Sequence, residues 1–294
     1  MEKVPVIVNP ISGQGIGLKA LPYIEAGLLK LKLKPEILKT QKSGDAQQFA
    51  AQAADDTPYI IAVGGDGTLN EVLNGIMPRH IPLAIFPTGT GNVFAKEIGI
   101  KTEVDRFLNM LENGHVKKFD VGLADSRHFL SVCGAGFVSE VVRRMEKQRR
   151  GNMRMTQYVH PTVAALLKYD FPAIKVEIDG EIVCEDAMNV EVGNTASYGG
   201  PLKFTTLARP DDGLLDICIF RKRTRWNVLK ALFGSVTGLY LHFREVMYFK
   251  GRRVSLTAGD TVPTHVDGDG NGTLPTSYGI LPMAASILVP PETH

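Results

Sequence analysis

The sequence predicts an α/β domain followed by a mainly antiparallel β-sandwich domain. Over about the first 115 residues, short apolar runs alternate with segments of helical periodicity, which is typical of a doubly wound parallel sheet covered on both faces. After Phe119, short strands and an Asp-Gly hairpin signal indicate antiparallel pairing. The 294 residues suffice for two cores. We expect domains over 1–118 and 119–294, with a return of the last residues to the first domain left open.

The first domain alternates strands and helices. The strand candidates are Val4–Val8, Pro35–Lys39, Tyr59–Val63 and Leu83–Phe86. The helix candidates are Leu18–Leu33, Asp45–Ala54, Thr68–Ile76, Asn92–Ile98 and Val104–Glu112. Because the strand candidates are almost continuously apolar, both faces of this sheet should be buried.

The second domain is predicted from hairpin signals and short strands. Asp179-Gly180 joins Lys175–Ile178 to Glu181–Cys184, and Asp125-Ser126-Arg127 joins Phe119–Leu123 to His128–Cys133. Further strand candidates are Leu214–Phe220, Glu245–Phe249, Arg253–Thr257 and Tyr278–Leu288. Helices are expected near Pro161–Tyr169 and Arg225–Phe243.

Composition excludes several classes of protein. A hydrophobic content of 44% and a charged content of 22% are ordinary for a soluble globular chain. The formal net charge of +2 argues against nucleic acid as a partner. The start Met1-Glu2-Lys3 lacks the apolar stretch of a secretory signal, and the three cysteines lack metal-ligand spacing. We therefore expect a cytoplasmic protein.

The most informative motif follows the third strand candidate. It reads Gly64-Gly65-Asp66-Gly67-Thr68, and Glu71 stands three residues after Thr68, the spacing of a capping box that starts a helix. A strand, a glycine turn and a helix N-terminus together favour phosphate, because unpaired N–H groups and the helix dipole both attract an anion. A carboxylate such as Asp66 repels phosphate unless Mg²⁺ or water lies between them. The motif predicts a nucleotide site in which Asp66 serves the metal; the alternative is a tight turn in which Asp66 only caps the helix.

Two more glycine-rich loops follow strand candidates. One is Asn9-Pro10-Ile11-Ser12-Gly13-Gln14-Gly15, and the other is Pro87-Thr88-Gly89-Thr90-Gly91-Asn92. The carboxyl ends of parallel strands share one edge of a sheet, so these loops should form one phosphate site together with Thr40. The chain has no Walker-type P-loop, and Leu18 stands where a dinucleotide fingerprint needs its third glycine.

These blocks carry a resemblance to a known family. They are Asn9-Pro10-x-Ser12-Gly13, GGDGTLNE at Gly64–Glu71 and Pro87-x-Gly89-Thr90-x-Asn92, followed by Phe119–Gly122, Gly134–Phe137, Tyr198–Gly200, Asp212–Asp216 and Val266–Asp269. In this order they resemble the diacylglycerol kinase catalytic domain family, which includes bacterial soluble lipid kinases and sphingosine kinases. The resemblance covers nearly the whole chain and implies a first domain like that of NAD kinases and diacylglycerol kinases. NAD kinases share GGDGT, but Asn70-Glu71 and the later blocks favour the lipid kinases.

The resemblance implies ATP and Mg²⁺ as cofactors. The residues that would hold ATP are Asn9, Ser12, Gly13, Thr40, Gly64, Gly65, Asp66, Gly67, Thr68, Asn70, Glu71 and Thr90. Asp66 would bind the catalytic Mg²⁺ directly or through water. Gln14 replaces a basic residue that is common in bacterial members, and Val93 replaces an Asp.

Asp267-Gly268-Asp269 would lie beside the acceptor hydroxyl. The resemblance implies that Asp269 corresponds to the Glu of a family D-G-E motif, which acts as the base, and that Asp267 matches the leading Asp. The base would then be one methylene shorter than in the family. Two alternatives stay open: a plain polar β-turn, and the first half of an EF-hand loop, although Tyr278 stands where that loop needs its Glu.

A second metal position is implied by the D-G-L-L-D block. In bacterial relatives its Asp, here Asp212, binds a structural Mg²⁺ with help from backbone carbonyls, which here would come from Arg209 and Leu214. The alternative is a turn that leads into a strand.

Two basic clusters suggest a membrane surface as a partner. The first contains Arg143, Arg144, Lys147, Arg149, Arg150 and Arg154. The second contains Arg221, Lys222, Arg223 and Arg225, directly before Trp226, the only tryptophan. Cations beside an aromatic ring and an apolar helix suit an anionic lipid surface, whereas the alternative is a solvated charged face. We expect transient contact with the inner face of the membrane, and a homodimer is left open.

Together, the motifs and the resemblance predict an ATP-dependent kinase acting on a lipid hydroxyl. Diacylglycerol, giving phosphatidic acid, is the leading acceptor, and a sphingoid base is next. The rival functions are an NAD kinase and a non-catalytic nucleotide- or lipid-binding protein.

Overall fold

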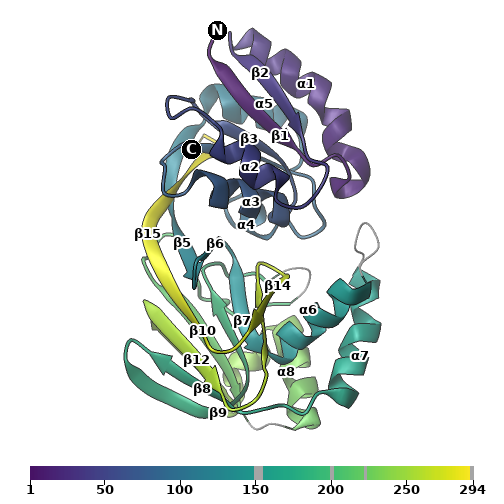
Figure 1. The fold of residues 1–294 in the computed structure, drawn as a ribbon, viewed down its shortest axis with the longest axis vertical. Helices are drawn as coiled ribbons and strands as arrows, with labels where there is room; N and C mark the ends of the chain where they lie inside the picture. Colours follow the sequence, from purple (N-terminus) through teal and green to yellow (C-terminus); the bar gives the residue numbers. More distant parts are fainter. Residues whose placement is uncertain (149–154, 199–201, 222–223, 292–294) are drawn as a thin grey trace. The chain divides into compact units, whose positions relative to one another are not determined.

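The computed structural model describes residues 1–148, 155–198, 202–221 and 224–291 and divides into two compact units (Figure 1). Unit 1 comprises Met1–Phe119 and the chain from Met283 onward, and unit 2 comprises Asp120–Pro282. The long strand β15, Thr276–Val289, supplies residues to both units. The predicted combination of an α/β unit with a β-rich unit is confirmed.

The sheet of unit 1 is parallel. Its strands are β1 (Lys3–Val8), β2 (Lys34–Lys39), β3 (Ile60–Gly64) and β4 (Leu83–Pro87). They run in the order β2-β1-β3-β4, and Ile287 of β15 pairs with Leu83 on the other side of β4. Every residue of β3 and β4 is buried, as their continuous apolar character predicts.

Helices connect these strands. They are η1 (Ser12–Gly15), α1 (Ile16–Lys30), α2 (Asp45–Ala51), α3 (Asp66–Ile76), α4 (Val93–Glu97) and α5 (Val104–Asn113). The first long helix begins two residues earlier than the sequence predicts, because Gly15 takes a left-handed conformation (φ 83°) and serves as its N-cap. It also ends three residues earlier, and Lys32 beyond it has a φ of 60°.

The strands of unit 2 pair in antiparallel fashion. They are β5 (His115–Ala124, which begins in unit 1), β6 (Arg127–Phe129), β7 (Val132–Gly136), β8 (Ile174–Ile178), β9 (Glu181–Gly193), β10 (Leu215–Arg221), β11 (Val246–Gly251), β12 (Arg253–Ala258), β13 (Pro263–Val266) and β14 (Asp269–Thr273). Their order is β14-β13-β7-β9-β8-β12-β15, and β10 pairs with β9 and β11.

Both faces of this sheet are covered. Along β10, Ile217 and Ile219 pack into one apolar core, whereas Cys218 and Phe220 pack into a second one. This alternation follows from the period of two in a strand. The second core is shared with the helices α6 (Phe137–Gln148), α7 (Val159–Lys168) and α8 (Arg225–Thr237) and with the short turns η2 (Met155–Tyr158) and η3 (Leu239–His242).

Two helical segments differ from the sequence prediction. The helix expected over Arg225–Phe243 ends at Thr237, because Gly238 adopts a left-handed conformation (φ 79°) and separates α8 from η3. Helix α6 was not predicted; its first turns hold the β-branched Val138, Val141 and Val142, which weaken the helical signal. Within the described ranges, no helix combines the length and the apolarity needed to cross a membrane.

Candidate functional site

Three loops of unit 1 meet at the carboxyl ends of β1, β3 and β4. The side-chain amide of Asn9, after β1, donates to the hydroxyl of Thr68, after β3, over 3.2 Å. The hydroxyl of Thr88, after β4, donates to the hydroxyl of Ser12 over 3.0 Å. These two bonds join all three loops, so the expectation that they share one edge of the sheet agrees with the geometry.

Glycines let the loops approach until backbone touches backbone. A Cβ on Gly89 would lie only 2.6 Å from Cα of Gly65. A Cβ on Gly13 would collide with the carbonyl oxygen of Thr88, and Gly13 also has a φ of 56°. A side chain of any size at position 13 or 89 would hold these loops apart. Only glycine therefore fits at these two positions.

The first loop has an unusual backbone. Gly13, Gln14 and Gly15 follow one another with φ values of 56°, 57° and 83°. Such a conformation is uncommon for a residue with a side chain, so Gln14 is held in a strained region. Successive N–H groups in turns of this kind form concavities that bind anions. The loop is therefore suited to phosphate oxygens.

Asp66 is the first residue of α3, and its carboxylate reaches the β4 loop. Its Oδ1 accepts a hydrogen bond from the backbone N–H of Val93 over 2.7 Å and so caps α4. A Cβ on Gly91 would lie 2.7 Å from Oδ2 of the same carboxylate, so a side chain at position 91 would displace that oxygen. A carboxylate where these loops meet is a ligand that suits Mg²⁺, which keeps several waters and takes further ligands from phosphates.

Thr68 and Glu71 do not form the expected capping box. The N-cap of α3 is Gly65, without a side-chain hydrogen bond. Glu71 instead accepts from the Ser43 hydroxyl (3.1 Å) and from the N–H groups of Gly44 (2.9 Å) and Ala46 (3.2 Å). It therefore satisfies the N-terminus of α2, where unpaired N–H groups need an acceptor.

The loop after β2 is also fixed to the same edge. The N–H of Thr40 donates to the carbonyl of Val8 over 2.9 Å. The carboxylate of Asp45 accepts from the N–H groups of Gln41 (2.7 Å) and Lys42 (3.0 Å). The backbone hydrogen bonds from Gln41 and then Lys42 lower the pKa of Asp45 below its ordinary value.

The other residues assigned to ATP differ in exposure. Gly64 ends β3 in the core, Gly67 is exposed in the first turn of α3, and Thr90 is exposed in the β4 loop. Asn70 is buried in α3 and accepts from the side-chain amide of Asn74 at its Oδ1 (3.2 Å) and its backbone carbonyl (2.9 Å). Its burial gives Asn70 a packing role in the helix.

Asp267 and Asp269 lie in unit 2 on one hairpin. Asp267 and Gly268 have φ values of 49° and 83° and form the two-residue turn between β13 and β14. Strands rather than helices flank the motif, which excludes the EF-hand alternative. The carboxylate of Asp267 accepts from the backbone N–H groups of residues 130, 131 and 132 at 3.2, 2.9 and 3.2 Å, so it holds the turn in place.

Asp269 begins β14, and its side chain is 35% exposed. Its Oδ2 lies 3.7 Å from Nη2 of Arg127. The next residue, Gly270, donates its N–H to Glu146 over 2.7 Å. The carboxylate thus remains accessible on a strand whose backbone is anchored to α6.

A buried group of polar side chains supports this hairpin. Nδ1 of His265, on β13, lies 2.8 Å from the hydroxyl of Ser139, and Nε2 lies 3.4 Å from Oε2 of Glu191. All three side chains are completely buried. The sequence carries no local signal for this group, because its members lie far apart along the chain. Burial rules out contact with a substrate, so the group acts through packing.

The proposed second metal position holds a lysine. Nζ of Lys250 lies 2.7 Å from Oδ2 of Asp212 and 3.3 Å from Oδ2 of Asp216. The N–H of Leu214 donates to Oδ1 of Asp212 (3.1 Å), and burial, as the largest cause, raises the pKa of Asp216. Across the described part of the chain, no three His, Cys, Asp or Glu side chains gather to hold a metal. Lys250 thus places a positive charge beside Asp212, and an ion held by Asp212 with the backbone carbonyls of Arg209 and Leu214 stays a prediction.

The basic clusters are partly paired. Arg143 and Arg144 each bind the buried carboxylate of Glu140 at 2.7 Å. Arg221 binds Asp186 at 2.9 Å. Arg149, Arg150, Arg154, Lys222, Arg223, Gly199 and Gly200 lie outside the described residues.

Comparison with known proteins divides the chain in the same way. Residues 3–124 match the model of the diacylglycerol kinase catalytic domain, and residues 131–289 match that of the YegS C-terminal NAD kinase beta sandwich-like domain. Proteins named diacylglycerol kinase from Staphylococcus carnosus and Bacillus subtilis are each 26% identical to it, over 99% of this chain and 96% and 98% of theirs.

Solved structures show the same similarity. A diacylglycerol kinase from Bacillus anthracis has a TM-score of 0.72 and 25% identity, covering 99% of this chain and 97% of that one. Another Bacillus anthracis structure, which carries that name provisionally, has a TM-score of 0.80 and 27% identity, covering 99% and 96%.

Proposed function

Because this chain belongs to the diacylglycerol kinase-like family, in which the catalytic domain is joined to a YegS C-terminal domain, we propose that it transfers the γ-phosphate of ATP to a lipid hydroxyl. The leading acceptor is diacylglycerol, which would give phosphatidic acid. The observation that carries the proposal is the contact of three glycine-rich loops around the carboxylate of Asp66.

The residues of unit 1 would bind and orient the nucleotide. Phosphoryl transfer needs mainly positioning and neutralisation of charge, so little covalent chemistry falls to the protein. The left-handed turn at Gly13–Gly15 and the N-terminus of α3 would receive phosphate oxygens. Ser12 and Thr68 would hold the loops at a fixed separation through their hydrogen bonds.

Mg²⁺ would be held through Asp66. The ion would neutralise phosphate charge when it is bound. Asp66 combines two tasks in this proposal: one oxygen caps α4, and the other, which lies beside Gly91, would bind the ion. The capping bond would fix the carboxylate before the ion arrives, which lowers the cost of ordering it.

Asp269 would act as the general base toward the acceptor hydroxyl. Its carboxylate is partly exposed and lies near Arg127. Asp267 would hold the turn through its three backbone hydrogen bonds. A base must lie within hydrogen-bond reach of its proton, so the position of Asp269 on a well-anchored strand matters.

The acceptor also sets where the enzyme works. Diacylglycerol resides in a bilayer, so we propose a cytoplasmic protein that visits the inner face of the membrane. The sequence offers no basis for a nucleic acid partner, given the net charge of +2.

Radiolabelled ATP and mixed micelles of candidate lipids test the proposal. We expect phosphorylation of diacylglycerol that needs Mg²⁺ and is lost in Asp269→Asn, whereas Asp260→Asn, which changes an exposed carboxylate, keeps the rate. Phosphorylation of NAD with no lipid product would make the chain an NAD kinase. ATP binding without any turnover, unchanged in Asp269→Asn, would favour the non-catalytic binding protein.

A further inference from the structure

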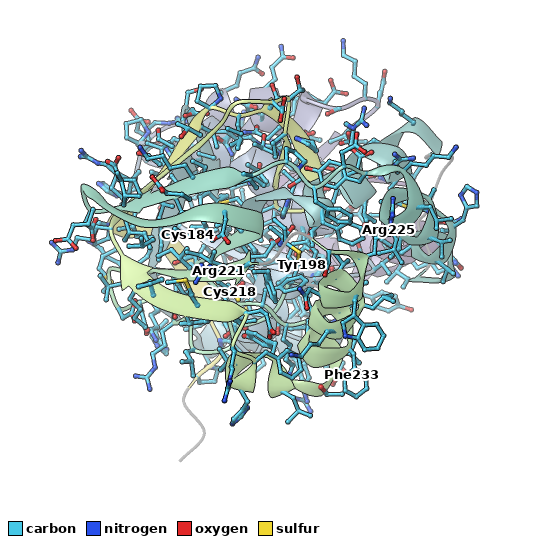
Figure 2. The ribbon with its side chains drawn as sticks, turned by 90° about the horizontal axis from the view of Figure 1, so that it is seen from below. Cys184, Tyr198, Cys218, Arg221, Arg225 and Phe233 are labelled. Atoms are coloured by element: carbon cyan, nitrogen blue, oxygen red, sulfur yellow. The ribbon has the colours of Figure 1, made fainter. Side chains whose placement is uncertain are left out.

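Helices α7 and α8 expose a set of large apolar side chains, which we call the apolar ridge. On α7 the ridge consists of Val159, Val163 and Leu167, which are 63%, 50% and 62% exposed. On α8 it consists of Trp226, Leu229, Phe233 and Val236, which are 73%, 44%, 61% and 52% exposed. Figure 2 shows Phe233 and Arg225 along the α8 side of unit 2.

The spacing places each set on one side of its helix. On α7 the exposed positions recur every four residues, and on α8 they follow steps of three, four and three residues. Such steps bring side chains onto a single stripe of a helix. The other side of α8 already packs into the core, where Val228 and Ser235 are buried. A helix that is apolar on both sides normally has both sides covered, so the outer stripe lacks its partner among the described residues.

The two stripes are held together by Arg225. Its guanidinium donates to the carbonyls of Leu166 (2.9 Å) and Leu167 (3.1 Å) at the C-terminal end of α7. A cation at this end of a helix is favourable, because the last carbonyls have no intrahelical partners. The ridge is therefore a fixed feature built from two helices.

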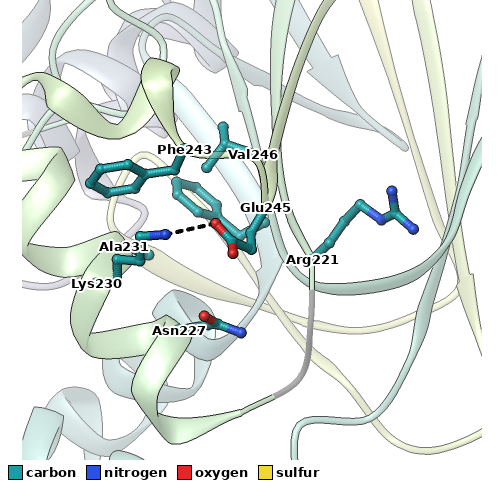
Figure 3. Close-up of a pocket in the computed structure, with 8 residues that line it drawn as sticks. Arg221, Asn227, Lys230, Ala231, Phe243, Glu245 and Val246 are labelled. Atoms are coloured by element: carbon teal, nitrogen blue, oxygen red, sulfur yellow. Dashed lines mark hydrogen bonds and ion pairs between the residues drawn. The ribbon is translucent and has the colours of Figure 1, made fainter.

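The inner side of α8 is fixed as well. Lys230 binds Glu245 at 2.8 Å, and its Nζ lies 4.7 Å from the centre of the Phe243 ring. Figure 3 shows these side chains around a small pocket, which has room for about one water molecule. The pocket is too small for a lipid chain, so an apolar partner would meet α8 at its outer stripe.

The charged side chains of the two helices themselves have one sign. Neither α7 nor α8 contains an Asp or a Glu, whereas the two helices carry Lys168, Arg225 and Lys230. Exposed apolar side chains with a tryptophan, bordered by cations, match the composition of helices that lie in the interface of anionic membranes. A symmetric dimer through this surface would bring the same cations of two copies toward each other, which disfavours a second copy as the occupant.

We propose that the apolar ridge inserts into the surface of a bilayer that contains anionic phospholipids. The inference rests on the proposed function, because a kinase for a bilayer lipid must reach its acceptor there. It assigns the contact to apolar side chains of α7 and α8 rather than to the ion-paired Arg143, Arg144 and Arg221.

The single tryptophan gives a direct test with the full chain. On addition of vesicles of phosphatidylcholine and phosphatidylglycerol, we expect the emission of Trp226 to shift to shorter wavelength and to be quenched by brominated acyl chains. Pure phosphatidylcholine vesicles should give a weaker effect, since the cations then have no anionic lipid. Emission that stays unchanged while the protein sediments with the anionic vesicles would overturn the proposal.

Matched variants identify the surface. Phe233→Asp and Val163→Asp should each lower the vesicle partition coefficient at least about tenfold, because each removes a large apolar group from the interface. Ile182→Asp, which changes a side chain that is 53% exposed on β9, should keep the wild-type partition coefficient. Equal losses in all three variants, or none in the ridge variants, would overturn the proposal. So would loss of a dimer in Phe233→Asp with unchanged vesicle binding.

A water-soluble short-chain diacylglycerol separates this inference from the proposed function. The ridge variants should phosphorylate it at the wild-type rate and lose activity only on vesicles. Wild-type protein that phosphorylates no lipid in either form would refute the kinase, whereas the emission of Trp226 would still decide the insertion. Ridge variants that remain fully active on vesicles would refute the insertion and leave the kinase in place.

Discussion

Nε2 of His265 lies 3.4 Å from Oε2 of Glu191, and both side chains are completely buried. The Ser139 hydroxyl donates to the carbonyl of Gly134 over 3.0 Å, so it has no second proton for the imidazole. Nδ1 of His265 must then donate to Ser139, which leaves Nε2 facing the carboxylate. Among the described residues, neither of these two atoms has a hydrogen-bond partner. His265 lies on β13, the strand that leads into Asp267 and Asp269, so its contacts help to fix the proposed base.

Removing the imidazole of His265 should therefore lower the free energy of unfolding far more than neutralising Glu191 does. His265→Leu removes the imidazole that faces the buried Glu191 carboxylate and leaves it only the hydrogen bond from Asn189, and we expect a loss of about 3–5 kcal/mol in the free energy of unfolding. Glu191→Gln keeps a side chain that can donate to Nε2, so its loss should be about 1 kcal/mol. Denaturant unfolding measures both.

The same two variants also test the link to turnover. At a temperature where both are folded, kcat should fall while KM for ATP stays near the wild-type value, since the nucleotide residues lie in the other unit. Two variants of equal stability, or an increase in KM for ATP alone, would contradict the positioning role.

The two tasks of Asp66 can be separated by substitution. Asp66→Asn keeps an oxygen that can accept from Val93 but loses the charge, so stability should hold while turnover with Mg²⁺-ATP falls at least about a hundredfold. Asp66→Ala removes the cap as well and should also lose about 1 kcal/mol of stability. Thermal unfolding and steady-state kinetics give both quantities. Wild-type turnover in Asp66→Asn would exclude a metal role for this carboxylate.

The length of the side chain at position 269 tests the proposed base. Asp269→Asn should lower kcat by about 10²–10⁴-fold, the usual contribution of a general base. Asp269→Glu restores the length found in the family, so it should retain much of the activity. Asp260→Asn is the control for loss of an exposed carboxylate. If Asp269→Asn and Asp269→Glu have equal rates, the carboxylate is not the base.

Local patterns predicted the loops of unit 1 better than the contacts that give their residues roles. The strands before Asn9, Gly64 and Pro87 are short and apolar, and a glycine follows each closely, so both the strand ends and their shared edge could be inferred. Glu71 shows the limit of this reasoning. Its spacing from Thr68 predicts a cap on its own helix, yet the carboxylate caps α2, because tertiary packing brings the loop before α2 within reach.

In unit 2 as well, local patterns predicted the turn but not the contacts between distant residues. The Asp267-Gly268 turn could be predicted as a turn from its two residue types, since Asp and Gly both tolerate the left-handed conformation. The partners of His265 could not, because Ser139 is 126 positions away in the chain. No local pattern encodes such a contact. The position of Lys250 beside Asp212 is likewise a product of strand pairing, in which β10 lies next to β11.

Acid should weaken unit 1 partly through Asp45. The N–H groups of Gln41 and Lys42 stabilise its carboxylate and lower its pKa below the usual 3.8. The ionised form therefore contributes stability above that ordinary value, and this contribution is lost as the pH falls through the lower pKa of the folded protein. Asp45→Asn should be less stable than wild type at pH 7, and the difference should shrink below about pH 4. Urea unfolding over this range, with exposed Asp56→Asn as the control, measures it; a constant difference would contradict the assignment.

Gly13 should tolerate no side chain, for two reasons that can be measured separately. An alanine there would be strained by the positive φ of 56°, at about 1–2 kcal/mol. Its Cβ would also push against the carbonyl of Thr88 and separate the two loops. Gly99→Ala, at a φ of 78° with no atom near its Cβ, has the first effect alone.

We therefore expect Gly13→Ala to lose more stability than Gly99→Ala in thermal unfolding, and only Gly13→Ala to raise KM for ATP. The increase in KM for ATP distinguishes the two variants better than the loss of stability does, because backbone strain alone would lower the stability of both. If the two substitutions shift KM by the same factor, the close approach of Gly13 to Thr88 has no part in nucleotide binding.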